Sequence, residues 1–142
     1  MSFVDASAIV AIINEEPGFE ELEKRLSDEK KRLYISPLVR FEATMAIARI
    51  HIADAKGAVN RSAIIEEAQQ IVDAVIKAFN AKEIAIDGKV GDLAAKAAMQ
   101  YGKVAGHKAK LNFGDCFAYG AAKAYRLPLI YKGNDFLETD LA

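Results

Sequence analysis

The sequence predicts an α/β domain of three layers (α/β/α), in which helices cover both faces of a mainly parallel sheet of four or five short strands. Two observations predict this fold. Short apolar runs of strand length alternate along the chain with longer segments of helical spacing, which is the order of βαβ units. Apolar residues make up 52% of the chain, much of it alanine, which favours closely packed helices. The length of 142 residues suits a single domain over 1–142.

Residues that break or cap helices set the ends of the expected elements. Pro17–Gly18 break the first helix. Ser36 and Pro37 are preferred residue types for a helix N-cap and a first helical position, and Asn60 or Ser62 can cap the helix that follows. The expected strands are residues 2–4, 33–35, 83–86 and 129–131. The expected helices are residues 6–14, 19–30, 37–54, 63–80, 90–104 and 114–126.

Charge and cysteine content limit the classes of partner and cofactor. The net charge is −1, so a basic surface for nucleic acid would have to be local. Cys116 is the single cysteine, which excludes an internal disulfide and a cysteine-based zinc site. No signal peptide is visible, and the apolar run 6–13 is too short to span a bilayer. We therefore expect a cytoplasmic protein without a membrane partner.

Acidic residues recur where the expected strands end. Asp5, Asp87 and Asp135 each follow a strand. Glu42 lies near the start of the helix after the remaining strand, close to an apolar helix face, and Asp115 lies in the first turn of the last helix. Because ligands gather at the carboxyl ends of parallel strands, these acids could crowd the same end of the sheet.

Several carboxylates at one place require neutralisation. Two like charges about 4 Å apart repel by roughly 4 kcal/mol at an effective dielectric constant near 20, so such a cluster persists only with bound protons or a cation. Ligand sets made only of oxygen suit Mg²⁺ or Mn²⁺ rather than zinc. The pattern therefore indicates metal-assisted hydrolysis of phosphodiester bonds.

Each acid also has a structural alternative. An isolated Asp after a strand is more often a helix N-cap than a metal ligand, and Asp87 fits that role best because a helix begins directly after it. We therefore leave Asp87 out of the site. Asp5 could also cap a helix, although Ser7 is available for that role. The helix dipole could favour Asp115, and Asp135 could be a turn residue. Their joint occurrence at one end of the predicted sheet favours the site.

Four stretches, taken together, resemble a known family. They are Phe3–Ala8, Ser36–Glu42, Leu111–Tyr119 and Lys132–Phe136, and they span nearly the whole chain in the family's order. By these motifs the sequence resembles the PIN-domain ribonucleases, in particular the VapC-type toxins of bacterial and archaeal toxin–antitoxin pairs. The resemblance implies a PIN-like version of the predicted fold.

The resemblance also implies roles for the acids. The implied acidic site consists of Asp5, Glu42, Asp115 and Asp135. Asp5, Asp115 and Asp135 would hold Mg²⁺, or Mn²⁺ in its place, and Glu42 would be a further ligand or help to activate water. Thr139–Asp140 resembles the family's tail and would add a supporting group. The implied activity is hydrolysis of RNA by a metal-dependent endoribonuclease, with tRNA or rRNA as the usual substrate.

Partners are implied by the resemblance as well. Family members usually form homodimers, and a cognate antitoxin of the VapB type holds them inactive by inserting a segment near the site.

A basic loop beside Asp115 is the candidate for contact with the RNA. Its basic residues, with one more from the preceding helix, are Lys96, Lys103, His107, Lys108 and Lys110. We hypothesise that this loop contacts phosphates together with Arg40; a solvated lysine loop is the alternative.

Two other functions compete with this interpretation. A phosphatase of the haloacid-dehalogenase type also begins with a strand and an aspartate, but it needs a second aspartate where this chain has Ser7. A non-catalytic RNA- or protein-binding PIN module would have a degraded site, whereas all four acids are present here. The sequence therefore favours the metal-dependent endoribonuclease.

Overall fold

The computed structural model describes residues 1–28 and 30–142. Its strands form one sheet in which every neighbouring pair runs parallel. The strands are β1 (Ser2–Val4), β2 (Leu33–Ile35), β3 (Lys82–Glu83) and β4 (Leu129–Ile130). Their order across the sheet is β3-β2-β1-β4, so β1 is bonded on both sides. The predicted parallel sheet is confirmed.

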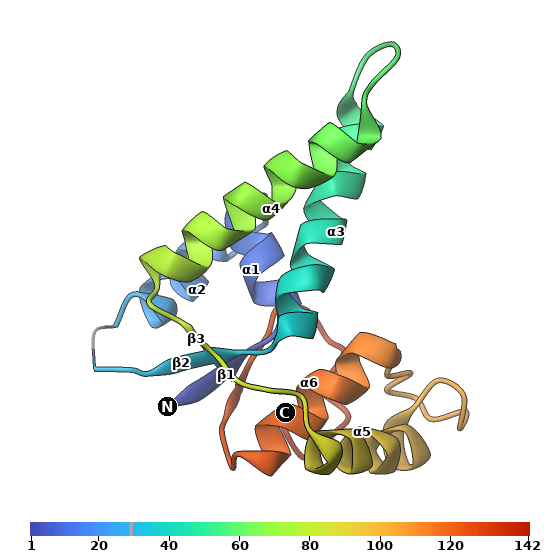
Figure 1. Ribbon diagram of the computed structural model, residues 1–142. Coiled ribbons are helices and arrows are strands. Elements are labelled where there is room, and N and C mark those ends of the chain that lie inside the picture. Colours follow the sequence, from blue (N-terminus) through green and yellow to red (C-terminus); the bar gives the residue numbers. More distant parts are fainter. Residues whose placement is uncertain (29) are drawn as a thin grey trace.

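Helices lie on both sides of this sheet (Figure 1). They are α1 (Ala6–Ile13), α2 (Phe19–Leu26), α3 (Pro37–Asp54), α4 (Arg61–Ala78), α5 (Gly88–Tyr101) and α6 (Phe113–Ala124). Helices α5 and α6 pack together on one side, while α1 contacts α2, α3 and α4 on the other. Helices α3 and α4 form a long hairpin that projects from the sheet (Figure 1). This is the predicted three-layer α/β/α arrangement.

The central strand β1 has no face open to solvent. Phe3 and Val4 are both buried, as expected for a parallel sheet that helices cover on both sides. Ile35 of β2 and Ile130 of β4 continue the core to either side. Because this packing fixes the carboxyl end of β1, it also fixes the starting point of Asp5. In the described part of the chain, no helix is long and apolar enough to cross a membrane.

The helix expected over 19–30 is shorter in the structure. Helix α2 ends at Leu26, and Ser27 donates both its backbone N–H and its hydroxyl to the Glu23 carbonyl oxygen. A side-chain bond of this kind competes with continuation of the helix. Residue 29, in the predicted extension, lies outside the described residues.

The helix expected over 90–104 also ends early. Helix α5 stops before Gly102, which takes an extended backbone geometry and pairs with Leu111 instead. The predicted last turn of this helix therefore belongs to the following loop. Of the two cap candidates for α4, Asn60 takes the role and Ser62 lies inside the helix.

The edge strand β3 is shorter than expected as well. The sequence predicts residues 83–86, whereas only Lys82 and Glu83 pair with β2. Strand β3 has a neighbour on one side only, and the chain leaves it to reach Asp87. The Asp87 side chain accepts the N–H of Val90 and caps α5, so its predicted role as a cap is confirmed.

Close packing of α6 on α5 depends on Gly120. A Cβ at this position would lie 2.7 Å from the Val90 carbonyl oxygen and 2.9 Å from the Ala94 nitrogen. Both are backbone atoms, which cannot turn aside as a side chain would. Ala97 and Ala121 are buried as well, so the side chains of the two helices are small where the helices meet. This contact fixes α6, the helix that carries Asp115.

We predict that Gly120→Ala destabilises the protein by about 1–3 kcal/mol, the usual effect of overpacking. The matched control is Gly91→Ala on α5, where an added Cβ meets nothing within 4 Å. That control should stabilise the helix by up to about 1 kcal/mol. Urea denaturation followed by circular dichroism measures both changes. Equal effects of the two substitutions would contradict the close approach at Gly120.

Candidate active site

Asp5 follows the central strand and is almost fully buried. Its Oδ2 accepts the N–H of Ser7 at 3.1 Å and the Ser7 hydroxyl at 2.6 Å, so Asp5 is the N-cap of α1. Ser7 Oγ in turn accepts the N–H of Lys132, which follows β4, at 3.0 Å. Burial raises the pKa of Asp5, although the hydrogen bonds from Ser7 oppose this rise. Asp5 is therefore a helix cap and a buried acid at once.

Asp115 lies half-buried in the first turn of α6 and takes part in the cap of that helix. Its Oδ2 accepts the Asn112 N–H at 3.1 Å, and Asn112 Oδ1 accepts the Asp115 N–H at 2.9 Å. This reciprocal capping box fixes the carboxylate at the helix start. Burial raises the pKa of Asp115 to about 6, against the hydrogen bond from Asn112 and with the help of the charges of Asp5 and Asp135.

Glu42 reaches this place from α3. Its carboxylate lies against the Cα of Gly114, so closely that any Cβ on Gly114 would overlap with it. Its Oε1 is buried and has no hydrogen-bond partner among the described residues. Burial and the charges of Asp5 and Asp115 raise the pKa of Glu42 to about 7, and Arg49 partly opposes the rise. Glu42 is therefore held beside two other acids without a compensating partner.

Asp135 completes the group from the turn after β4. Its side chain is exposed, and the turn is anchored by Phe136, which is buried in the core. In addition to burial, the charge of Asp135 raises the pKa values of Asp5 and Asp115, which requires it to lie near both. The structure thus brings Asp5, Glu42 and Asp115 together around the carboxyl end of β1, with Asp135 near Asp5 and Asp115.

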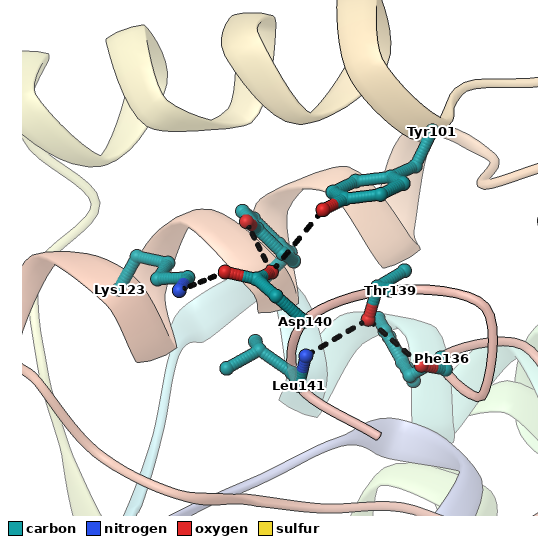
Figure 2. A network of polar contacts seen from close by, with 7 residues as sticks. Tyr101, Lys123, Phe136, Thr139, Asp140 and Leu141 are labelled. Atoms are coloured by element: carbon teal, nitrogen blue, oxygen red, sulfur yellow. Dashed lines mark hydrogen bonds and ion pairs between the residues drawn. The ribbon is translucent and has the colours of Figure 1, made fainter.

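The predicted supporting group Thr139–Asp140 is used elsewhere. Asp140 accepts hydrogen bonds from Tyr119 at 2.7 Å and from Tyr101 at 3.5 Å, and it pairs with Lys123 (Figure 2). The hydroxyl of Thr139 donates to the Phe136 carbonyl oxygen at 2.7 Å. Asp140 therefore fixes the C-terminal tail on α5 and α6, and Thr139 closes the turn that follows Asp135.

The cation beside Glu42 is not the one that the sequence predicts. Arg40, expected to contact phosphate, forms a two-point ion pair with Asp73 of α4, with distances of 2.6 and 2.8 Å. The guanidinium therefore already has an acidic partner in the α3–α4 hairpin, and its contact with phosphate stays a prediction. Arg49 acts on Glu42 instead. The signal that could have found Arg49 is its spacing of seven residues from Glu42, which is two helical turns.

The lysine loop borders the site on the Asp135 side. Lys108 pairs with Glu138 at 2.7 Å, which ties the loop to the segment after Asp135. Lys110 and Asp135 line the same hollow of about 440 Å³. The hypothesis of phosphate contact stays a prediction, and Lys110 is its best candidate because Lys108 already has an acidic partner.

The donor set fits a divalent cation in its chemistry. Several acids lie close together here, and the buried Oε1 of Glu42 has no hydrogen-bond partner among the described residues, which favours a bound proton or cation. Among the described residues, no three potential ligands already close around one point. Asp5 and Asp115 each use Oδ2 in a cap and keep Oδ1 for other contacts. Mg²⁺ retains several waters and needs only one or two protein carboxylates, so an open set of this kind suits Mg²⁺ or Mn²⁺.

Comparisons of the sequence with known proteins give the same family as the motifs. Residues 2–141 match the PIN domain. The chain is 61% identical over 141 residues to a VapC ribonuclease of Rhizobium meliloti (strain 1021), with 99% of each chain covered. It is 32% identical over 138 residues to the Ribonuclease VapC42 of Mycobacterium tuberculosis (strain ATCC 25618 / H37Rv), which covers 97% of this chain and 95% of that relative.

Solved structures of low sequence identity share the fold. One is VapC20 of Mycobacterium tuberculosis, a toxin that cleaves the sarcin-ricin loop, with a TM-score of 0.69, 12% identity and coverage of 96% of this chain and 93% of that one. Another is a toxin–antitoxin complex from Klebsiella pneumoniae, with a TM-score of 0.66, 15% identity and coverage of 99% and 94%. The chain therefore belongs to the PIN-domain family and, within it, to the VapC ribonucleases. The predicted family and fold are confirmed.

We predict a characteristic pH dependence of stability without metal. Glu42 and Asp115 have pKa values of about 7 and about 6 in the folded protein, against ordinary values of 4.5 and 3.8. Between these limits the folded protein binds more protons than the unfolded chain, so its stability falls as the pH rises from about 4 to about 7. Thermal unfolding in EDTA should show this decline, and Mg²⁺ or Mn²⁺ should reverse it at neutral pH.

The substitution Glu42→Gln should flatten the decline, because a neutral amide carries no titrating charge. Glu67→Gln, which changes an exposed acid on α4, is the matched control and should keep the wild-type profile. If both variants follow the wild-type profile, Glu42 is not held in the acidic cluster.

We further predict that Gly114→Ala lowers RNA cleavage by about 100-fold, because a shift of about 1 Å in a reacting group has effects of that size. The added Cβ has to displace the Glu42 carboxylate. Gly88→Ala, at the start of α5 in open space, is the matched control and should cleave like the wild type. NMR titration of Glu42 supplies a second measurement, since displacement into solvent should lower its pKa. Full activity of Gly114→Ala would refute the contact.

Proposed function

We propose that the chain is a Mg²⁺-dependent endoribonuclease and the toxin of a VapBC-type toxin–antitoxin pair. The observation that carries the proposal is the Glu42 carboxylate, which lies against Gly114 beside Asp5 and Asp115 and whose buried Oε1 has no hydrogen-bond partner among the described residues. An acid in that position is stable in its charged form only with a counter-charge. The names of the VapC relatives support RNA as the substrate.

The four acids divide the chemistry between them. Asp5, Asp115 and Asp135 hold the cation, and Glu42 orients the attacking water and takes its proton. Without metal the pKa of Glu42 is raised to about 7, and a bound cation would favour its charged form, which is the form that accepts a proton. The water oxygen then bonds to phosphorus while the bond from phosphorus to the leaving ribose oxygen breaks, and that oxygen takes up a proton from solvent water. When bound, Mg²⁺ supplies charge stabilisation for the phosphate and acidifies water.

Partners and location follow from the same proposal. The antitoxin would be of the VapB type, and the solved toxin–antitoxin complex of similar fold supports a protein partner for this class. A homodimer is supported by exposed apolar side chains on and beside α5 and α6, since Met99, Val104 and Phe113 are all more than two thirds exposed. The cytoplasm is the proposed location because tRNA and rRNA are found there.

The two alternatives have less support. The position where a haloacid-dehalogenase phosphatase needs a second aspartate is Ser7, whose hydroxyl is bonded to Asp5. A binding module without activity has no need to keep four acids whose charges oppose one another. The comparisons give VapC ribonucleases rather than phosphatases.

The test is cleavage of total cellular RNA by purified protein with Mg²⁺ or Mn²⁺, against EDTA. We expect discrete products that disappear with EDTA and in Asp115→Asn, which removes one charge of the metal site. Asp87→Asn is the matched control, because it makes the same change at the cap of α5 outside the site. It should cleave like the wild type, since Asn caps a helix as well as Asp.

Two outcomes would contradict the proposal. Equal cleavage by the wild type and Asp115→Asn would place the activity elsewhere or in a contaminant. Release of phosphate from small monoesters without cleavage of RNA would favour the phosphatase.

A further inference from the structure

A hollow of about 580 Å³ lies beside the acidic site. It is formed by α1, α3 and the segment after β4, and we call it the Phe41 pocket. The side chains that matter here are Val10, Phe41, Met45, Arg49 and Lys132. Its volume falls within the range of about 300–1,000 Å³ for small-molecule sites. It is therefore large enough for one nucleotide.

One face of α3 supplies the main wall of the pocket. Phe41, Met45 and Arg49 are spaced by four residues, so they follow one another along the same side of the helix. Phe41 is 60% exposed although it is a large apolar side chain, and Arg49 is exposed as well. The pocket thus presents an aromatic ring and a guanidinium in line, with an apolar side chain between them.

The pocket is continuous with the acidic site. Glu42 follows Phe41 in the chain and lines the pocket itself, while its carboxylate rests on Gly114. Lys132 also lines the pocket, and its backbone N–H is bonded to Ser7, the partner of Asp5. A group bound in the pocket would therefore be next to the proposed centre of cleavage.

The charges in the pocket favour a phosphate. Within the described residues, neither Arg49 nor Lys132 forms an ion pair with an acid. Glu16 adds a negative charge at the rim, and Glu42 belongs to the acidic site. Arg49 is thus available for an anionic ligand, in a protein whose net charge is −1. Lys132 adds a second positive charge to the lining, although its ammonium group lies against Gly18.

We propose that the Phe41 pocket is a substrate subsite for one unpaired nucleotide of the RNA, next to the phosphate that is cut. Phe41 stacks on the base, and Arg49 holds the adjoining phosphate. This inference rests on the proposed ribonuclease function and names its substrate as single-stranded or looped RNA. Bases can stack on an aromatic side chain only where they are splayed out of a duplex.

The first test measures binding of a short fluorescein-labelled single-stranded RNA by fluorescence anisotropy, with Mn²⁺ present. An Asp115→Asn background keeps the RNA intact. We expect Phe41→Ala to weaken binding by about 5- to 150-fold, the range for the loss of one stacked base, and Phe41→Trp to retain it. Tyr125→Ala is the matched control, since it removes another exposed aromatic side chain at the far end of α6. Its affinity should be unchanged.

The second test separates the base from the phosphate. Arg49→Ala should reduce the slope of log affinity against log salt by about 0.7, the value for one phosphate contact on a single strand. Arg61→Ala, at the start of α4, should leave the slope unchanged. In a series of RNAs with one abasic site each, a single position should weaken binding as much as Phe41→Ala does. Combining that abasic RNA with Phe41→Ala should cause no further loss.

Failure of this inference is distinguishable from failure of the proposed function. If the wild type cleaves RNA but Phe41→Ala and Arg49→Ala bind RNA as the wild type does, the subsite is wrong and the ribonuclease stands. The pocket would then be open to a protein partner. If the wild type neither binds nor cleaves RNA with metal present, both are overturned.

Discussion

The site depends on one contact, between the Glu42 carboxylate and the bare Cα of Gly114. Helix α3 lies on one side of the sheet and α6 on the other (Figure 1), and the two helices meet at this point. A side chain on residue 114 would hold them apart. The absence of one methyl group therefore allows acids from opposite layers to lie together around the end of β1. Their mutual repulsion is the physical reason for a counter-charge at this place.

Asp5, which the sequence leaves open as a helix cap or a metal ligand, caps α1 and also belongs to the acidic group. Asp115 belongs to the same group and closes the capping box of α6 with one carboxylate oxygen, while Asn112 is the N-cap. The same hydrogen bonds that begin α1 and α6 thus orient the site, and Ser7 links it to the segment after β4. The site is built from the ends of the regular elements, so its geometry is as rigid as the sheet itself.

The fold and the four acids could be predicted because their signals are local. Strand ends, the Ser36 cap and the motif around Asp115 are each visible within a few residues. What the sequence could not show are contacts between distant residues. Arg40 meets Asp73 across a helical hairpin, and Gly114 receives Glu42 across two layers. The predicted length of β3 was wrong for a related reason. The end of this edge strand depends on its pairing with β2 and on the position of the helix that follows, and both are contacts between distant parts of the chain.

The dual use of Asp5 and Asp115 has a consequence for loss of function. Asp5 is the N-cap of α1, and asparagine caps a helix about as well as aspartate does, so exchange of one carboxylate oxygen for an amide nitrogen removes a charge and keeps that cap. Asp115 is the third residue of α6, whose N-cap is Asn112, so its exchange for asparagine leaves the cap residue in place. A copy altered in this way would remain folded and would still present the Phe41 pocket and the α5–α6 surface. Loss of activity by this route would therefore leave the other surfaces of the protein unchanged.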